Sequence, residues 1–248
     1  MYPGIWAVVA GSGWWVRARL KQWRPPMIRR AAAWAGVPAL WLTLDWPLGP
    51  LGTGYLASAH ALQFMLLIFL VPPLFLAALD RSRFPEDVSR VPFAGRLATQ
   101  PLLGGVTVTV VIVATHMPAV VDGLMRFELG AFALDSSWLG AGLLLWWPVV
   151  VRRPTRRWFN GLVCALYVFL STQVHLLVGM WLLTADFPVY STYELAPRVF
   201  RLAALEDQRV AGAIMAGIAE PVVLSVITVV IFGWFAEQER QGSVSMDS

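Results

Sequence analysis

The chain alternates between long apolar runs and short polar stretches. The clearest run, residues 54–79, holds no Lys, Arg, Asp or Glu over 26 residues. At about 1.5 Å rise per residue, a helix of this length would exceed the ~30 Å hydrocarbon core of a bilayer. Such a run has no polar face to show to water, whereas in lipid a helix satisfies its own backbone groups. This stretch therefore predicts a transmembrane helix, with a kink at Pro72-Pro73.

The other apolar runs predict five more spans and one short segment. The segment, residues 5–16, is too short to span, and we expect it to be either interfacial or the tail of a truncated seventh span. The six expected spans are residues 31–48, 54–79, 102–121, 138–151 (recruiting residues from Leu129 onward), 159–184 and 209–235. This pattern predicts an all-α, polytopic helical bundle. We expect one domain over residues 1–240 and a disordered polar tail over 241–248.

Composition supports membrane insertion. Hydrophobic residues make up 58% of the chain and charged residues 14%, whereas a soluble domain is usually about 25% charged. The net charge of +4 comes from basic residues in short loops between the expected spans, which is typical of membrane proteins. We therefore expect contact with lipid and none with nucleic acid.

The basic residues also predict an orientation. Fifteen of the 19 Lys and Arg residues fall on one side of the expected spans, and only Arg126, Arg198, Arg201 and Arg209 fall on the other. Loops rich in Lys and Arg stay in the cytoplasm. The loops 122–137 and 185–208 are therefore expected outside the cell, and the C-terminus inside.

Each of the three histidines lies in a different expected span. His60, His116 and His175 would lie about 9, 8 and 13 Å from the outer ends, from the rise of a helix. Ionisable residues in a membrane usually face the bundle interior or a cavity. One interpretation is a shared copper site, with Met117 as a further ligand. The other is a set of separate hydrogen bonds between helices, for example to Gln63.

The last expected span carries further candidates. Glu220, which precedes Pro221, is either a proton or metal ligand or a neutral carboxyl bonded to backbone that the proline frees. The first reading would suit a proton-coupled or small-molecule carrier, because such sites lie at broken helices. Asp207, beside Gln208, is expected to cap this helix. No catalytic signature such as G-x-S-x-G or H-E-x-x-H occurs, so we expect no enzyme. One haem held between two histidines is a further alternative.

Five strings occur in this order along the chain: HALQFMLLIFLVPPLF, THMP, GLLLWWPVV, VGMWLLTADFPVYSTY and DQRVAGAIM. Each resembles a stretch of the multispanning bacterial CtaG family of cytochrome c oxidase assembly factors. The order and spacing hold from about Arg17 to Arg240. The resemblance implies a role in maturing a haem-copper oxidase at the bacterial inner membrane, with oxidase subunits as partners and copper as the cargo.

The resemblance also implies which residues matter. By position, these are His60, Gln63, His116, Pro118, Tyr190, Tyr193, Asp207 and Gln208. Three histidines of the family pattern are replaced here, by Phe64 and by residues near Ala131 and Asp135. We therefore expect an assembly factor that binds rather than reacts. Its expected site is an outer-leaflet pocket, lined by the three histidines, for copper or for a helix of the partner.

Overall fold

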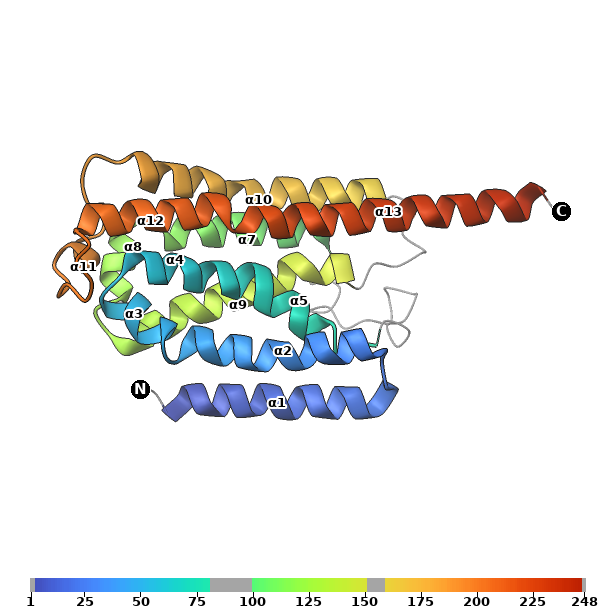
Figure 1. Ribbon diagram of the computed structural model, residues 1–248, viewed down its shortest axis with the longest axis horizontal. Coiled ribbons are helices and arrows are strands. Elements are labelled where there is room, and N and C mark those ends of the chain that lie inside the picture. Colours follow the sequence, from blue (N-terminus) through green and yellow to red (C-terminus); the bar gives the residue numbers. More distant parts are fainter. Residues whose placement is uncertain (1–2, 81–99, 151–158, 247–248) are drawn as a thin grey trace.

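The structure is a computed structural model that describes residues 3–80, 100–150 and 159–246, and this part is helical without strands (Figure 1). Its elements are α1 (Pro3–Trp23), α2 (Met27–Leu44), α3 (Leu48–Gly54), α4 (Ala57–Met65), the π-helix η1 (Leu66–Leu70), α5 (Val71–Leu76), α7 (Pro101–Thr115), α8 (Pro118–Leu124), α9 (Glu128–Val150), α10 (Gly161–Thr184), α11 (Ser191–Glu194), α12 (Ala204–Gly217) and α13 (Ala219–Met246).

The long helices lie side by side, and the short helices α3, α8 and α11 gather at one end of the bundle (Figure 1). We call this the outer end. The largest fully buried side chains come from different helices and include Trp138, Trp146, Phe64 and Leu67. A single apolar core therefore runs through the bundle, and α4, η1, α5 and α9 supply much of it.

The prediction of a helical membrane bundle is confirmed, but six spans are not. Within the described ranges, four helical stretches are long and apolar enough to cross a membrane: Ala57–Leu76, Glu128–Val150, Gly161–Thr184 and Ala204–Arg240. A fifth is added if α7 and α8, which meet at an angle of 74°, count as one broken span. The helix α2 is not among them, and it carries Arg29 and Arg30 in its first turn.

Several predicted boundaries are wrong. The expected outer loop 122–137 is mostly helical, because α9 begins at Glu128, one residue before Leu129, from which the span at 138–151 was expected to recruit residues. The short apolar segment 5–16 belongs to the 21-residue helix α1. The last helix continues past residue 235 to Met246, into the tail that was expected to be disordered. The predicted basic loops around residues 81–99 and 151–158 lie outside the described residues.

The proline pair changes the helix type around it. Pro72 has no N–H to offer to the carbonyl of Ile68, four residues earlier. The backbone loosens into the π-helix η1, in which the N–H of Val71 bonds to the carbonyl of Leu66. The indole N–H of Trp146 donates to the Ile68 carbonyl at 2.9 Å and replaces the missing bond. The kink expected at the prolines is thus a π-helical turn. Trp146 of α9 supplies the hydrogen-bond donor that this turn lacks.

Two glycines bring α10 and α12 into close contact. A Cβ at Gly212 would lie 2.6 Å from the carbonyl oxygen of Gly179, and a Cβ at Gly179 would lie 2.9 Å from that of Gly212. Small residues suit helix contacts in lipid, where dispersion forces replace the hydrophobic effect. This contact fixes the start of α12, which carries Asp207 and Gln208, against α10.

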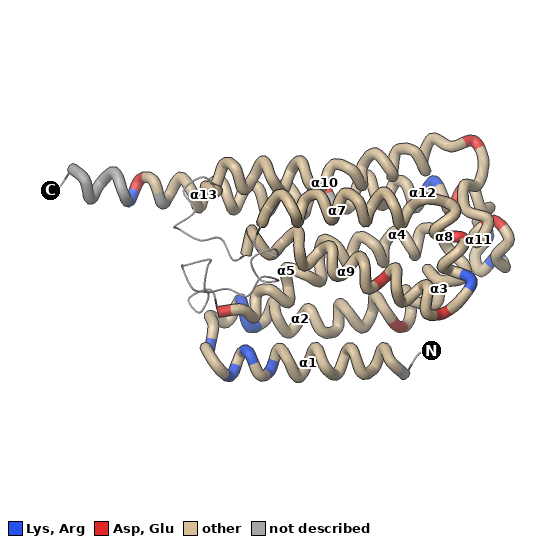
Figure 2. The backbone as a smooth tube through the Cα atoms, turned by 180° about the vertical axis from the view of Figure 1, so that it is seen from behind, with Lys and Arg blue, Asp and Glu red and all other residues tan. Residues whose placement is uncertain are grey.

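Charged residues gather at the two ends of the bundle (Figure 2). Lys and Arg of α1 and of the start of α2 lie at the end opposite α3, α8 and α11, while the outer end carries most Asp and Glu residues together with some Lys and Arg (Figure 2). The basic cluster at the end opposite the outer end agrees with a cytoplasmic location of that end. The orientation itself stays a prediction.

Candidate functional site

Two histidines meet in an aromatic cluster at the outer end. Its members are His60, Phe64, His116, Trp138 and Tyr193, which we call the outer cluster. The ring centroids of His60 and Trp138 are 4.8 Å apart, and those of Phe64 and His116 are 4.6 Å apart. His60 and Phe64 are one turn apart on α4, so both reach the same neighbours. The cluster therefore joins α4, α9 and the bend after α7.

Hydrogen bonds orient the rings of this cluster. The indole N–H of Trp138 donates to the hydroxyl of Thr115 at 2.9 Å. Nδ1 of His116 lies 2.8 Å from the carbonyl oxygen of Ile112. Because a carbonyl only accepts, this nitrogen carries the proton, and the lone pair of neutral His116 is on Nε2.

Three ring nitrogens of the outer cluster have no partner. Nδ1 and Nε2 of His60 and Nε2 of His116 are buried and make no hydrogen bond to any part of the chain that the structure describes. Both side chains are 4% exposed. A buried polar atom without a partner is costly, so these nitrogens are candidates for binding a ligand.

The segment 185–203 covers the outer cluster, and we call it the lid. The phenol of Tyr190 donates to the carbonyl of His116 at 3.0 Å, and that of Tyr193 donates to the carbonyl of Gly52 at 2.6 Å. Burial raises the pKa of both phenols, so they stay neutral hydrogen-bond donors at physiological pH. The ring of Tyr193 also lies 5.7 Å from that of His60. The lid thus closes directly over both histidines.

Asp207 connects the lid side of α12 to the first turn of α4. Its carboxylate accepts the N–H of Ala57 at 2.6 Å, the N–H of Ser58 at 3.3 Å and the hydroxyl of Ser58. The expected cap on its own helix is wrong, because Glu206 instead accepts the N–H of Ala203 there. Asp207 therefore caps α4, the helix that carries His60.

Two further polar residues secure the lid. The amide oxygen of Gln208 accepts the N–H of Val189 at 2.6 Å, and its Nε2 donates to the carbonyls of Leu182 and Phe187. On the other side, Asp122 of α8 accepts the backbone N–H and the hydroxyl of both residues that open α11. These bonds run to Ser191 and Thr192 at 2.7–3.2 Å.

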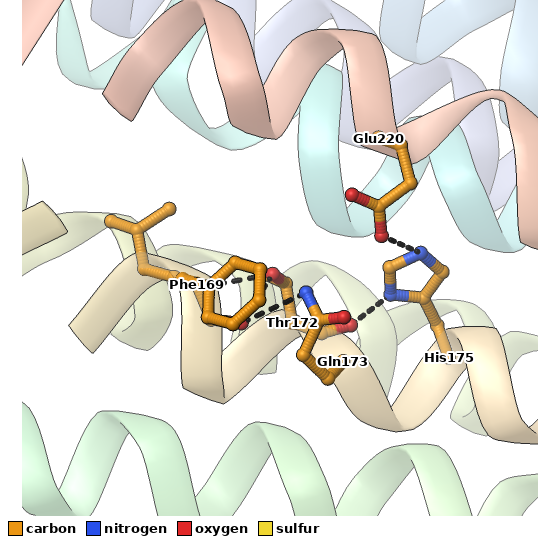
Figure 3. Close-up of polar contacts among 6 residues, drawn as sticks. Phe169, Thr172, Gln173, His175 and Glu220 are labelled. Carbon is orange, nitrogen blue, oxygen red and sulfur yellow. Dashed lines mark hydrogen bonds and ion pairs between the residues drawn. The ribbon is translucent and has the colours of Figure 1, made fainter. Parts of the chain in front are cut away.

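His175 belongs to a different polar site (Figure 3). Its Nδ1 bonds to the carbonyl of Thr172, and its Nε2 lies 3.9 Å from Oε1 of Glu220. Its ring lies 5.1 Å from that of Phe69. Glu220 stands in the first turn of α13, after the break that follows α12. Glu220 therefore faces a histidine across helices, although neither Nε2 of His175 nor Oε1 of Glu220 makes a hydrogen bond within the described residues.

The described residues do not assemble the predicted three-histidine metal site. No group of three or more His, Cys, Asp and Glu side chains in the described ranges lies close enough to hold a metal ion. Met117, expected as a further ligand, is 52% exposed. His60 and His116 belong to one cluster, while His175 lies apart from it, beside Glu220. Copper binding stays a prediction.

A family model for cytochrome c oxidase caa3 assembly factors, Caa3_CtaG, matches residues 12–237. The chain belongs to this family. The resemblance found in the sequence is thereby confirmed. Comparison with curated proteins and with solved structures gave no match.

In this member of the family, the residues implied by the resemblance gather at the outer end. Gln63, one of them, donates from Nε2 to the carboxylate of Asp135 at 3.0 Å. Asp135 and Ala131, near which the family pattern has histidines, line one cavity of about 300 Å³. No local pattern in the sequence indicates this cavity, because its walls come from α1, α2, α3 and α9.

Proposed function

We propose that this family member acts by binding rather than by turnover, and that it holds copper(I) as cargo between His60 and His116 for delivery to a haem-copper oxidase. The main support is the free ring nitrogens of these two histidines within one buried cluster. Imidazole nitrogen is a suitable donor for copper. The bond from His116 to Ile112 would orient that donor, as outer hydrogen bonds do for metal-binding histidines.

The lid suggests how the cargo would leave. Two hydrogen bonds, from Tyr190 and Tyr193, close it over the histidines. A typical hydrogen bond contributes about 1 kcal/mol net, so loosening these two bonds alone costs little, but the bonds with Gln208 and Asp122 also hold the lid. In this proposal an oxidase subunit that docks on the lid supplies contacts that replace these bonds and open it. In this proposal the outer end faces away from the cytoplasm of a bacterial plasma membrane, and the C-terminus lies inside.

The proposal can be tested in cells that lack the gene for this protein. Such cells would receive wild-type protein or one of three variants: His60→Ala, His116→Ala or His175→Ala. Oxidase activity and copper per oxidase would be measured in membranes with equal amounts of each protein. We expect wild type and His175→Ala to restore both, and the other two variants to fail. Full restoration by His60→Ala and His116→Ala would reject the proposal.

A proton-coupled carrier is the second candidate. It is favoured by the contact between His175 and Glu220 at the break between α12 and α13, because carriers place their sites at interrupted helices. Purified protein in vesicles would then carry protons or a solute down an imposed pH gradient. Glu220→Gln would stop this transport, whereas His60→Ala would not. Absence of any transport by wild-type vesicles would remove this candidate.

A further inference from the structure

The cavity near the outer end is a second candidate binding site, and it is separate from the outer cluster. It measures about 300 Å³ and lies among α1, α2, α3, the first turns of α9 and the turn before α9. Its walls are partly apolar, with Leu44 and Phe127 among them, and four charged side chains also line it. These are Asp45, Arg126, Glu128 and Asp135. The volume is at the small end for ligand pockets, which suits a head group or a small molecule.

The carboxylates in this cavity are incompletely paired. Asp45 is only 3% exposed, and one of its oxygens accepts the indole N–H of Trp41 at 3.0 Å. Asp135 accepts one N–H from Gln63 at 3.0 Å. Within the described part of the chain, the second oxygen of each accepts no hydrogen bond, and no Lys or Arg nitrogen lies within 4.0 Å of either carboxylate. Asp135 is half-buried and Asp45 is buried, and a buried carboxylate is costly unless a cation or further donors reach it.

We propose that this cavity binds a primary ammonium group, presented by the head group of an ethanolamine phospholipid. An ammonium group has three N–H donors, and Asp45 and Asp135 offer open oxygens inside the cavity. The apolar wall suits the short methylene stem of ethanolamine. Arg126 lines the same cavity and supplies a planar donor group for the adjoining phosphate.

Binding can be measured by calorimetry on the full chain in detergent. The probes are dihexanoyl phosphatidylethanolamine, dihexanoyl phosphatidylcholine and free ethanolamine. The variants are Asp45→Asn, Asp135→Asn and Arg126→Gln, with Asp186→Asn as the control because Asp186 is an exposed acid of the lid. We expect the ethanolamine lipid to bind more tightly than the choline lipid. Each cavity Asp→Asn change should weaken it at least ~10-fold, as for a lost hydrogen bond to a charged group, while the control leaves it unchanged.

The three probes distinguish a lipid head group from a free amine as the source of the ammonium group. If the lipid is the ligand, Arg126→Gln weakens the ethanolamine lipid but leaves the weak binding of free ethanolamine unchanged. Equal affinity for free ethanolamine and the lipid would instead identify a soluble amine and overturn the lipid assignment. Absence of amine binding, equal binding of the choline lipid, or binding that neither Asp45→Asn nor Asp135→Asn changes would overturn the proposal. The comparison of the two lipids uses wild-type protein alone, so it does not depend on whether the variants fold.

Discussion

Replacing Asp207 by alanine should destabilise the outer end more than any exposed substitution there. The carboxylate of Asp207 is 1% exposed and accepts three donors from the first turn of α4. The first N–H groups of a helix have no partner within the helix, and α4 has no side-chain cap of its own. The variant therefore leaves the N–H groups of Ala57 and Ser58 and the Ser58 hydroxyl unpaired.

The magnitude follows from the number of bonds lost. A buried donor left unpaired costs about 1–3 kcal/mol, and loss of an N-cap alone costs about 0.5–2 kcal/mol. Three donors would be left unpaired close to the membrane surface, where water can replace part of the lost bonding. We therefore expect the free energy of unfolding to fall by about 3–5 kcal/mol. This is a large part of the roughly 5–15 kcal/mol that stabilises most proteins. Asp207→Asn retains one acceptor oxygen, so its loss should be smaller.

The free energy of unfolding can be measured by denaturation in mixed detergent micelles, together with amide hydrogen exchange. We expect the amides of Ala57 and Ser58 to lose protection in Asp207→Ala, while the amides of α10 keep theirs. Asp186→Ala is the matched control, and an exposed change of this kind should stay within about 0.5 kcal/mol. The capping role would be refuted if Asp207→Ala matched the control and both amides stayed protected.

Three further predictions address other contacts. Trp146→Phe should cost about 1–3 kcal/mol of unfolding free energy, because the carbonyl of Ile68 loses its donor; an unchanged stability would refute the role assigned to that bond. Gly212→Ala should cost about 1–3 kcal/mol by overpacking α10, whereas Gly140→Ala, with open space around it, should be neutral or slightly stabilising. Burial raises the pKa of Tyr193, so the fold favours the neutral phenol and loses stability as pH rises above about 10, the unfolded value. Unfolding measured from pH 7 to 11 should show a smaller alkaline loss in Tyr193→Phe, and an identical loss would contradict this assignment.

The apolar runs predicted where most helices lie, because an uncharged run of that length has one stable state in lipid. They also placed His60 and His116 near the outer end. The runs did not predict α3. The expected extension of the span at residues 138–151 back to Leu129 is confirmed to within one residue, because α9 begins at Glu128.

Side-chain partners were predicted less well than helices. Asp207 was expected to cap its own helix, yet its partners, Ala57 and Ser58, are 149 or 150 residues away in sequence. The contact between His175 and Glu220 depends on the register of α10 against α13, which no local pattern encodes. Helical depth alone grouped His175 with the other two histidines. Rotation about the helix axis decides which neighbours a side chain meets, and the sequence gives depth far better than rotation.

The most direct test of the account is copper(I) binding by the purified chain under reducing conditions, with a competing chelator to set the free copper concentration. The account predicts about one copper per wild-type chain, held by two imidazole nitrogens. His60→Ala and His116→Ala should each lose it, while His175→Ala keeps it. Wild-type protein without copper, or equal loss in all three variants, would contradict a site between His60 and His116.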